Sequence, residues 1–293
     1  ANNYTITDAD IQMMADTKLR ELNSLEWSSK LQYDGQGKLQ ASSNPNTVNV
    51  NSDLNFYTKN TEITYLNLRY NNSHNIFANG TNFTVGLAVK MIAADANLPV
   101  LYGGADGTIT DISEREATVE QTKLTVKSGT YKEIYGGGKG YKAKINGNTE
   151  IILDTAAYFV DHTNNKNPEI TNLDLRLASI HGSGSGGSTL ANGMTRTIKV
   201  VNSMDPKDLE NVPYELNVKD MAEFDRLDVG EADKLAFLPQ LNVKGKLESA
   251  HTPYEYTGDI CLYNGRLNFE GSASSHANNL KACLLYTSPS PRD

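Results

Sequence analysis

The sequence predicts an all-β solenoid, in which short strands stack on one another in successive coils. The first observation is a phrase that occurs twice, because residues 62–69 (EITYLNLR) return as residues 169–176 (EITNLDLR). Each copy is followed by an Ala-Asn-Gly turn, at 78–80 and again at 191–193. The second observation is that apolar residues alternate with polar ones and show no helical period. Self-similarity of this kind is typical of stacked β-strand units.

The composition agrees with many short strands joined by polar turns. The chain has 293 residues, of which 38% are hydrophobic, a low fraction for a compact enzyme of this size, and Asn, Thr, Ser and Gly are abundant. The net charge is −8, with acidic and basic residues interspersed. Nucleic acid is therefore not an expected partner, because neutralising phosphates requires clustered Lys and Arg. No apolar stretch approaches the length of a membrane span, so none is expected.

The first segment, residues 1–37, has two interpretations. Asp8 is a candidate helix cap, and apolar residues recur at helical spacing after it, at Ile11, Met14, Ala15, Leu19 and Leu22. A capping helix would cover the open apolar edge of the first coil. The alternative is an irregular first coil of the same stack.

Residues 38–282 are predicted to form the repeats. Small groups of apolar residues recur between Asn, Ser and Thr, and each group is typical of a strand of about three to five residues with one buried face. The repeated phrase predicts that four leucines point inward: Leu66, Leu68, Leu173 and Leu175. Residues 204–221, which contain two prolines, are the best candidate for an excursion from the stack or a weak domain boundary.

A second repeated phrase contains glycine. Leu101-Tyr102-Gly103-Gly104 returns as Ile134-Tyr135-Gly136-Gly137, and Ile180-His181-Gly182 is a degenerate third copy. Glycine is expected where the backbone turns with positive φ or where one coil approaches the next closely. The run 182–187 (GSGSGG) has no counterpart after residues 62–69, so we expect a loop insertion whose deletion leaves the fold intact.

The repeated Tyr-Gly-Gly phrases, the strands that read Leu-Thr-Val-x-x-Gly, the Phe-Ala-Asn-Gly turn and the Leu-Asn-Val-x-Gly rungs together resemble large secreted or wall-anchored surface proteins of Gram-positive bacteria. The resemblance covers most of residues 38–282. It implies a right-handed parallel β-helix located outside the cell or on the cell wall. It also implies a monomeric rod with an adhesive or structural display role, no catalysis, and glycans or cell-surface proteins as partners.

The last residues, 283–293 (CLLYTSPSPRD), resemble a translated sequencing adapter and are left out of the fold prediction. Cys283 is then not native, and Cys261 is the remaining cysteine, so no native disulfide is expected. The native chain is expected to continue past Ala282.

Candidate ligand-binding residues are three tyrosines that cluster in one segment: Tyr131, Tyr135 and Tyr141. Aromatic rings on the outer face of a rod can stack on sugar rings. The structural alternative is that tyrosine fits half-buried strand surfaces well.

The alternative function is a carbohydrate-active enzyme, a polysaccharide lyase or glycoside hydrolase on the same fold. Such an enzyme needs a non-repeated acidic cluster beside a groove, where carboxylates act as acid and base. Asp174 with Arg176, or Asp154 with Asp161, are candidates. However, Asp174 and Arg176 occupy repeat positions that hold Asn and Arg in the first copy, which predicts outward-facing residues of a ladder rather than catalytic groups.

No cofactor and no metal are expected. The run 182–187 fits the pattern G-x-G-x-x-G, but a turn follows it and not the helix that would bind a pyrophosphate. The glycines at 136–140 lack the spacing of a P-loop. The five histidines are scattered, and Cys261 has no cysteine partner at metal spacing.

Overall fold

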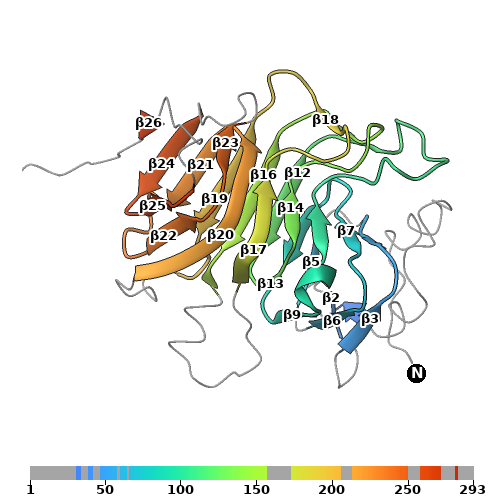
Figure 1. The fold of residues 1–293 in the computed structure, drawn as a ribbon, viewed down its shortest axis with the longest axis horizontal. Helices are drawn as coiled ribbons and strands as arrows, with labels where there is room; N and C mark the ends of the chain where they lie inside the picture. Colours follow the sequence, from blue (N-terminus) through green and yellow to red (C-terminus); the bar gives the residue numbers. More distant parts are fainter. Residues whose placement is uncertain are drawn as a thin grey trace, which may run out of the picture.

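The chain forms a parallel β-helix. The computed structural model describes residues 31–33, 39–41, 47–57, 60–64, 66–156, 173–205, 213–249, 258–271 and 281–282. Most strands pair in parallel with the strands one coil before and one coil after, so that the coils follow one another from blue to red (Figure 1). The fold class expected from the repeats is therefore confirmed.

Sheet 1 and sheet 2 run the length of the stack. The strands of sheet 1, in spatial order, are β1(Leu31–Tyr33), β2(Leu39–Ala41), β5(Asn60–Ile63), β8(Asn82–Val85), β12(Thr122–Val126), β16(Thr149–Asp154), β19(Arg196–Val201), β21(Arg226–Gly230), β24(Asp259–Tyr263) and β26(Lys281–Ala282). Those of sheet 2 are β4(Leu54–Asn55), β7(Asn75–Phe77), β10(Val100–Tyr102), β14(Glu133–Tyr135), β17(Leu173–His181), β20(Pro213–Phe224), β22(Leu238–Val243) and β25(Arg266–Phe269). At the first coil, β1 and β2 pair antiparallel.

Two smaller sheets complete the coils. Sheet 3, the third face of the early coils, contains β3(Thr47–Val50), β6(Leu66–Tyr70) and β9(Val89–Ile92), with a single 3-10 turn, η2(Asp95–Asn97), after it. A side lobe contains β11(Thr118–Val119), β15(Lys144–Ile145) and β18(Thr189–Leu190). Two short strands flank sheet 2, because β13(Gly129–Thr130) pairs with β17 and β23(Leu247–Ser249) pairs with β20.

The core is a set of columns in which each inward side chain lies over its counterpart in the next coil. In sheet 2 one buried column consists of Leu54, Ile76, Leu101, Ile134, Ile180, Met221 and Leu247. In sheet 1 another consists of Phe83, Leu124, Ile151, Ile198, Leu227 and Ile260. Since each coil buries its apolar residues against its two neighbours, stability is the sum of these neighbour contacts.

The four leucines of the repeated phrase all point inward. Leu66 and Leu68 are completely buried, and Leu173 and Leu175 are 6% and 1% exposed. Leu66 pairs with Val89 in the next coil. The N–H of Val89 donates to the Ser128 hydroxyl at 2.9 Å. Gly129, the residue after Ser128, pairs with Leu173 in the following coil. The two copies of the phrase therefore lie in one column of the stack.

The glycine phrase also stacks in register. Tyr102 pairs with Tyr135, and Tyr135 pairs with His181, so the following glycines form a column as well. A Cβ added to Gly136 would meet the carbonyl oxygen of Gly182 well under 3.0 Å, closer than real Cβ atoms approach. A Cβ added to Gly103 would meet the carbonyl oxygen of Gly136 in the same way. Close approach of consecutive coils, and not positive φ, thus requires glycine here.

The run 182–187 is more ordered than the expected loop insertion. It is the third layer of the side lobe, in which Asp106, Lys139 and Ser185 bridge one another in parallel. β11, β15 and β18 pair in the same order, and the lobe extends beyond the strand ends near the label β18 (Figure 1). Three consecutive coils share this lobe, and its dispensability stays a prediction.

Two expected boundaries are only partly described. The capping helix expected in residues 1–37 falls on residues outside the described part, except that Leu31–Tyr33 is strand β1. Within the expected excursion, residues 206–212 are also outside it, but residues 213–221 belong to β20. Alternate residues of β20 point inward and are buried, namely Tyr214, Leu216 and Val218, so this half of the segment is part of the stack. Residues 283–293 lie outside the described part.

Candidate functional site

A ladder of stacked rings lies on the outer face of sheet 2. Phe77 stacks on Tyr102 with ring centroids 5.0 Å apart, Tyr102 on Tyr135 at 4.8 Å, and Tyr135 on His181 at 4.4 Å. These residues are in register in β7, β10, β14 and β17, one residue after each inward apolar residue of the column. The lobe covers the ladder, since the Tyr102 hydroxyl lies 2.9 Å from the hydroxyl of Ser185. The ladder ends at His181, because Ala222 follows in the next coil.

His181 lies between two carboxylates. Its Nε2 is 3.8 Å from Oε1 of Glu133, and its Nδ1 is 3.9 Å from Oε2 of Glu223. Both ring nitrogens are buried and neither has a hydrogen-bond partner. A buried polar group without a partner costs about 1–3 kcal/mol, so such a group in a folded protein requires an explanation.

Burial favours the neutral form of the His181 imidazole. Burial lowers the pKa of His181 and outweighs the nearby carboxylates of Glu223 and Glu133, which act to raise it. The Tyr135 hydroxyl donates to Oε1 of Glu133 at 3.0 Å, and burial followed by the charge of Glu133 raises the pKa of that tyrosine. The Ser183 hydroxyl donates to Oε2 of Glu223. Both glutamates are therefore held by hydroxyl groups that lie beside the imidazole.

Glu223 has an unusual backbone conformation. Its φ is 57°, in the left-handed region that non-glycine residues rarely adopt. Glu223 occupies the next position of the column formed by Gly103, Gly136 and Gly182. A Cβ added to Gly182 would meet the carbonyl oxygen of Glu223. A strained backbone at a charged residue is a feature that gathers at functional sites.

A third column changes at the same level of the stack. The hydroxyls of Thr122 and Thr149 each donate to a glycine carbonyl of the following coil, Gly136 and Gly182, at 2.6 Å. Arg196 occupies the next position of this column. It lines a cavity of about 280 Å³ together with Ser183. In three adjacent columns, then, the repeated Tyr, Gly and Thr give way to His181, Glu223 and Arg196.

This arrangement is suited to proton transfer at a bound ligand. A neutral imidazole can accept a proton, and a carboxylate on either side can stabilise the imidazolium that forms. No group of three His, Cys, Asp or Glu side chains in the described part of the chain is placed to hold a metal ion.

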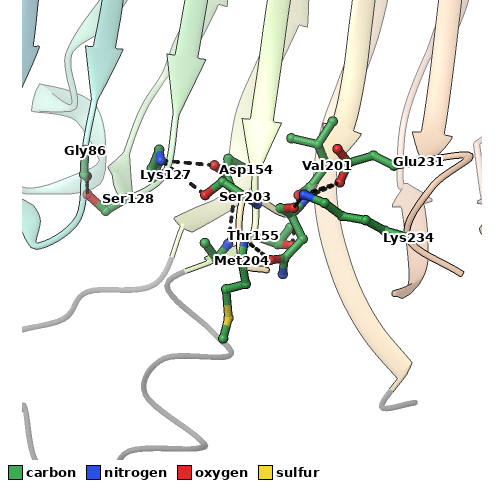
Figure 2. Close-up of polar contacts among 12 residues, drawn as sticks. Gly86, Lys127, Ser128, Asp154, Thr155, Val201, Ser203, Met204, Glu231 and Lys234 are labelled. Atoms are coloured by element: carbon green, nitrogen blue, oxygen red, sulfur yellow. Dashed lines mark hydrogen bonds and ion pairs between the residues drawn. The ribbon is translucent and has the colours of Figure 1, made fainter. Parts of the chain in front are cut away.

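A second polar cluster, at the end of sheet 1, has a structural role. Figure 2 shows Asp154 beside Lys127 and Ser203: its Oδ2 lies 3.3 Å from Nζ of Lys127, and its Oδ1 accepts the Ser203 N–H at 3.1 Å. The same Oδ1 accepts the N–H of Ala156 at 3.0 Å. In the next coil, Glu231, labelled in Figure 2, accepts a backbone hydrogen bond. Its donor is the N–H of Asn202, at 2.9 Å. These groups form hydrogen bonds with one another and with the backbone N–H groups of the turns that follow β16 and β19. The imidazole nitrogens of His181, in contrast, have no hydrogen-bond partner.

The three tyrosines predicted to bind a ligand do not share an outer surface. Tyr131 is fully buried and its hydroxyl donates to the Ser128 carbonyl at 3.0 Å, because the bend between β13 and β14 turns the ring into the core. Tyr135 is a covered rung of the ladder, 8% exposed. Tyr141 is 67% exposed, with Nζ of Lys142 5.9 Å from its ring centroid. A common sugar-stacking platform of these three rings is thus not formed.

The acidic candidates of the enzyme interpretation are also accounted for. Asp174 and Arg176 form an ion pair of 2.7 Å on the outer surface of β17, as expected for ladder residues. Asp154 belongs to the structural cluster, and Asp161 lies outside the described residues.

Sequence patterns missed the residues that the fold gathers. Glu133 and Glu223 come from the coils before and after that of His181, and the parallel pairing of β14, β17 and β20 places one on either side of the imidazole. Arg196 comes from β19, in the same coil as His181. One signal was present, because Ile180-His181-Gly182 departs from the Tyr-Gly-Gly phrase at the histidine. A departure from a repeat that introduces an ionisable residue marks the site.

No family model, curated protein or solved structure matches this chain. Within the described residues, no helix has the length and apolar character that crossing a membrane requires.

Proposed function

We propose that this protein is a bacterial surface β-helix that binds a glycan on the outer face of sheet 2, at His181, Glu133 and Glu223. The location and the adhesive role rest on the resemblance of its repeated phrases to surface proteins of Gram-positive bacteria. The site rests on one observation: the ionisable residues His181, Arg196 and Glu223 replace the repeated side chains within two consecutive coils of an otherwise regular stack. Regular packing favours the continued ladder, so the replacements point to a ligand.

Polar side chains of this kind suit a carbohydrate. A sugar offers hydroxyls that donate to carboxylates and accept from imidazole, and the two ring nitrogens of His181 are without protein partners. Because these nitrogens are buried, a sugar hydroxyl reaches them only when the groups covering the imidazole move aside, and it would then supply the missing hydrogen bonds. The stiff stack holds the side chains in place, which lowers the entropy lost on binding.

A second candidate function is cleavage of the bound glycan. It is favoured by the neutral imidazole between two carboxylates, because the imidazole can accept a proton as a base and the imidazolium that forms can return that proton as an acid. The cluster is non-repeated and lies beside a cavity, which is the feature expected of the enzyme and not of a display rod. Binding alone is the first proposal because no distance here fixes a reacting atom.

The test is a glycan-array screen of the full chain, with turnover assays on uronate and neutral polysaccharides. His181→Phe keeps the ring stacking and removes both nitrogens, and Arg176→Met changes an exposed residue on the same strand as a matched control. We expect His181→Phe to weaken binding at least tenfold and Arg176→Met to leave it unchanged. Product release that His181→Phe abolishes would establish cleavage, and the absence of any bound glycan would refute the proposal.

A further inference from the structure

We infer that the cavity at Arg196 is an anion subsite that receives the negatively charged group of an acidic sugar, a carboxylate or a sulfate. The inference rests on the proposed glycan site and names the class of sugar that it takes. It is carried by the shape of the stack at this level, by the hydrogen-bonding state of the guanidinium and by the acidic groups beside it.

The cavity exists because the side lobe stops. Three coils carry the lobe between sheet 2 and sheet 1, and β18 is its last strand. In the next coil the chain passes from β20 to β21 through Asp225 alone. The resulting step leaves a cavity of about 280 Å³, lined by Ser183, Gly184, Ser188, Thr189, Leu190 and Arg196. This volume is just below the range of about 300–1,000 Å³ for drug-sized ligands, which suits a single sugar residue.

Arg196 brings a positive charge that is only partly engaged. Its side chain is 14% exposed, and its Nη1 lies 3.4 Å from Oδ2 of Asp225, which also accepts the Arg196 backbone N–H at 2.9 Å. The buried Nε has no hydrogen-bond partner. Because the guanidinium presents its donors as a planar fork, a carboxylate or sulfate can accept two parallel hydrogen bonds from it.

Gly182 packs closely against Arg196. An added Cβ at Gly182 would lie 3.0 Å from Cβ of Arg196, just as added Cβ atoms at Gly103 and Gly136 would lie 2.9 and 3.1 Å from Cβ of Thr122 and Thr149, so glycine leaves room for the facing residue in all three coils. A bulky side chain at residue 182 would displace the arginine and narrow the cavity.

The subsite adjoins the imidazole cluster. Ser183 lines the cavity and donates its hydroxyl to Glu223, whose carboxylate lies 3.9 Å from Nδ1 of His181. An acidic sugar would be repelled by Glu223 and Glu133 and attracted to Arg196, so only one orientation is favourable. With its anionic group in the cavity, the adjoining sugar atoms would lie toward His181.

The experiment compares the affinity of the full chain for oligogalacturonate, for its methyl ester and for a sulfated oligosaccharide, by isothermal titration calorimetry. The methyl ester keeps the sugar backbone and removes the charge. We expect the acid to bind at least tenfold more tightly than the ester, with a preference that shrinks as salt is added. Tight binding of only one of the two acidic probes would identify carboxylate or sulfate as the group received.

Two variants locate the charge. Arg196→Met should abolish the preference for the acid while leaving affinity for the ester within about twofold, and Arg176→Met, an exposed arginine, should change neither. If Arg196→Met does not fold, Arg196→Lys should retain part of the preference, because the charge remains and the fork is lost. Equal binding of acid and ester by the unmodified chain, or a preference that survives Arg196→Met, would overturn the inference.

A separate readout distinguishes this inference from the proposed function. The Nε–H signal of Arg196 in a ¹⁵N NMR spectrum should shift when free galacturonate or inorganic sulfate is added. A shift without binding of any oligosaccharide would mean that the subsite exists and the glycan function is wrong. No shift with either anion would refute the subsite, whatever the oligosaccharides do.

Discussion

Ring stacking holds His181 in place, because no hydrogen bond to its nitrogens does. Its ring lies 4.4 Å from that of Tyr135, and the carboxylates of Glu133 and Glu223 are just beyond hydrogen-bond distance. At the residue scale, therefore, a packing interaction positions a group whose buried polar atoms have no hydrogen-bond partner. Stacking on Tyr135 also restricts the movement of the imidazole, which is what a binding or proton-transfer role requires.

The lowered pKa of His181 makes stability depend on pH. Below its ordinary pKa of about 6.5 the unfolded chain binds a proton that the folded chain does not, so stability should fall as the pH is lowered through that value. His181→Phe should remove this part of the dependence and raise stability by about 1 kcal/mol at pH 6, since no buried nitrogen is left unsatisfied. Urea unfolding of both chains between pH 5 and 8 measures it. Parallel pH curves for the two chains would contradict this account.

An inward leucine and an outward leucine of β17 provide a matched pair. Leu173→Asp should destabilise the protein by about 3 kcal/mol or more, because an unpaired carboxylate would enter the core. Leu177, on the same strand, is 44% exposed, and Leu177→Asp should change stability by less than about 0.5 kcal/mol. Urea midpoints followed by circular dichroism give both values. Similar midpoints for the two variants would show that the inward register of β17 is wrong.

At the element scale, the distance between coils is set by backbone and not by side chains. Gly103, Gly136 and Gly182 let each coil approach the next so closely that no side chain fits. Hydroxyls in the neighbouring column, from Thr122 and Thr149, then bind the glycine carbonyls. The Tyr-Gly-Gly phrase is thus a packing unit in which the ring stacks outward and the glycine closes the gap.

Gly136→Ala should be more damaging than a change at a glycine with free space. Its Cβ would meet the Gly182 carbonyl oxygen, so the coils must separate and nearby hydrogen bonds lengthen, at a cost of about 2 kcal/mol or more. Gly193 has a φ of 78° and nothing near its Cβ position, and Gly193→Asn should be nearly neutral because asparagine tolerates this conformation. Thermal unfolding compares them. Equal losses would indicate that close approach is not what selects glycine.

The strands and their columns could be predicted from the sequence, because apolar alternation and repeated phrases report directly on neighbouring coils. The side lobe could not, since backbone pairing through residues such as Asp106, Lys139 and Ser185 leaves no apolar period. The site could be predicted only as an irregularity at His181. Its carboxylates and Arg196 come from separate coils, and their proximity depends on a register that local sequence does not encode.

At the scale of the whole molecule, each coil touches only its neighbours, so stability should be uneven along the rod. Central strands such as β12 and β16 have a partner on both sides and fully buried inward residues. β25 is the last strand of sheet 2 in the described part of the chain, and its apolar residues Leu267 and Phe269 are only half buried.

Hydrogen exchange followed by mass spectrometry should show this gradient. Peptides covering residues 122–126 and 149–154 should exchange slowest, and those covering 266–269 should exchange at least a hundredfold faster, because opening an end strand breaks fewer contacts. A single exchange rate for all strands would mean that the stack opens as one unit and not coil by coil.

The direction of the hydrogen bonds between coils also determines how the protein responds to force. These hydrogen bonds run along the axis of the stack. A pull on its two ends therefore strains the hydrogen bonds of one pair of coils at a time, and the coils should separate one after another at low force. One turn contains 22 residues between Asn60 and Asn82 and another contains 47 between Asn148 and Thr195. Each rupture would therefore release between about 70 and 160 Å of chain at about 3.4 Å per residue. A molecule built this way should lengthen in steps, one coil at a time, when it is pulled along its axis, and each step should dissipate part of the applied load.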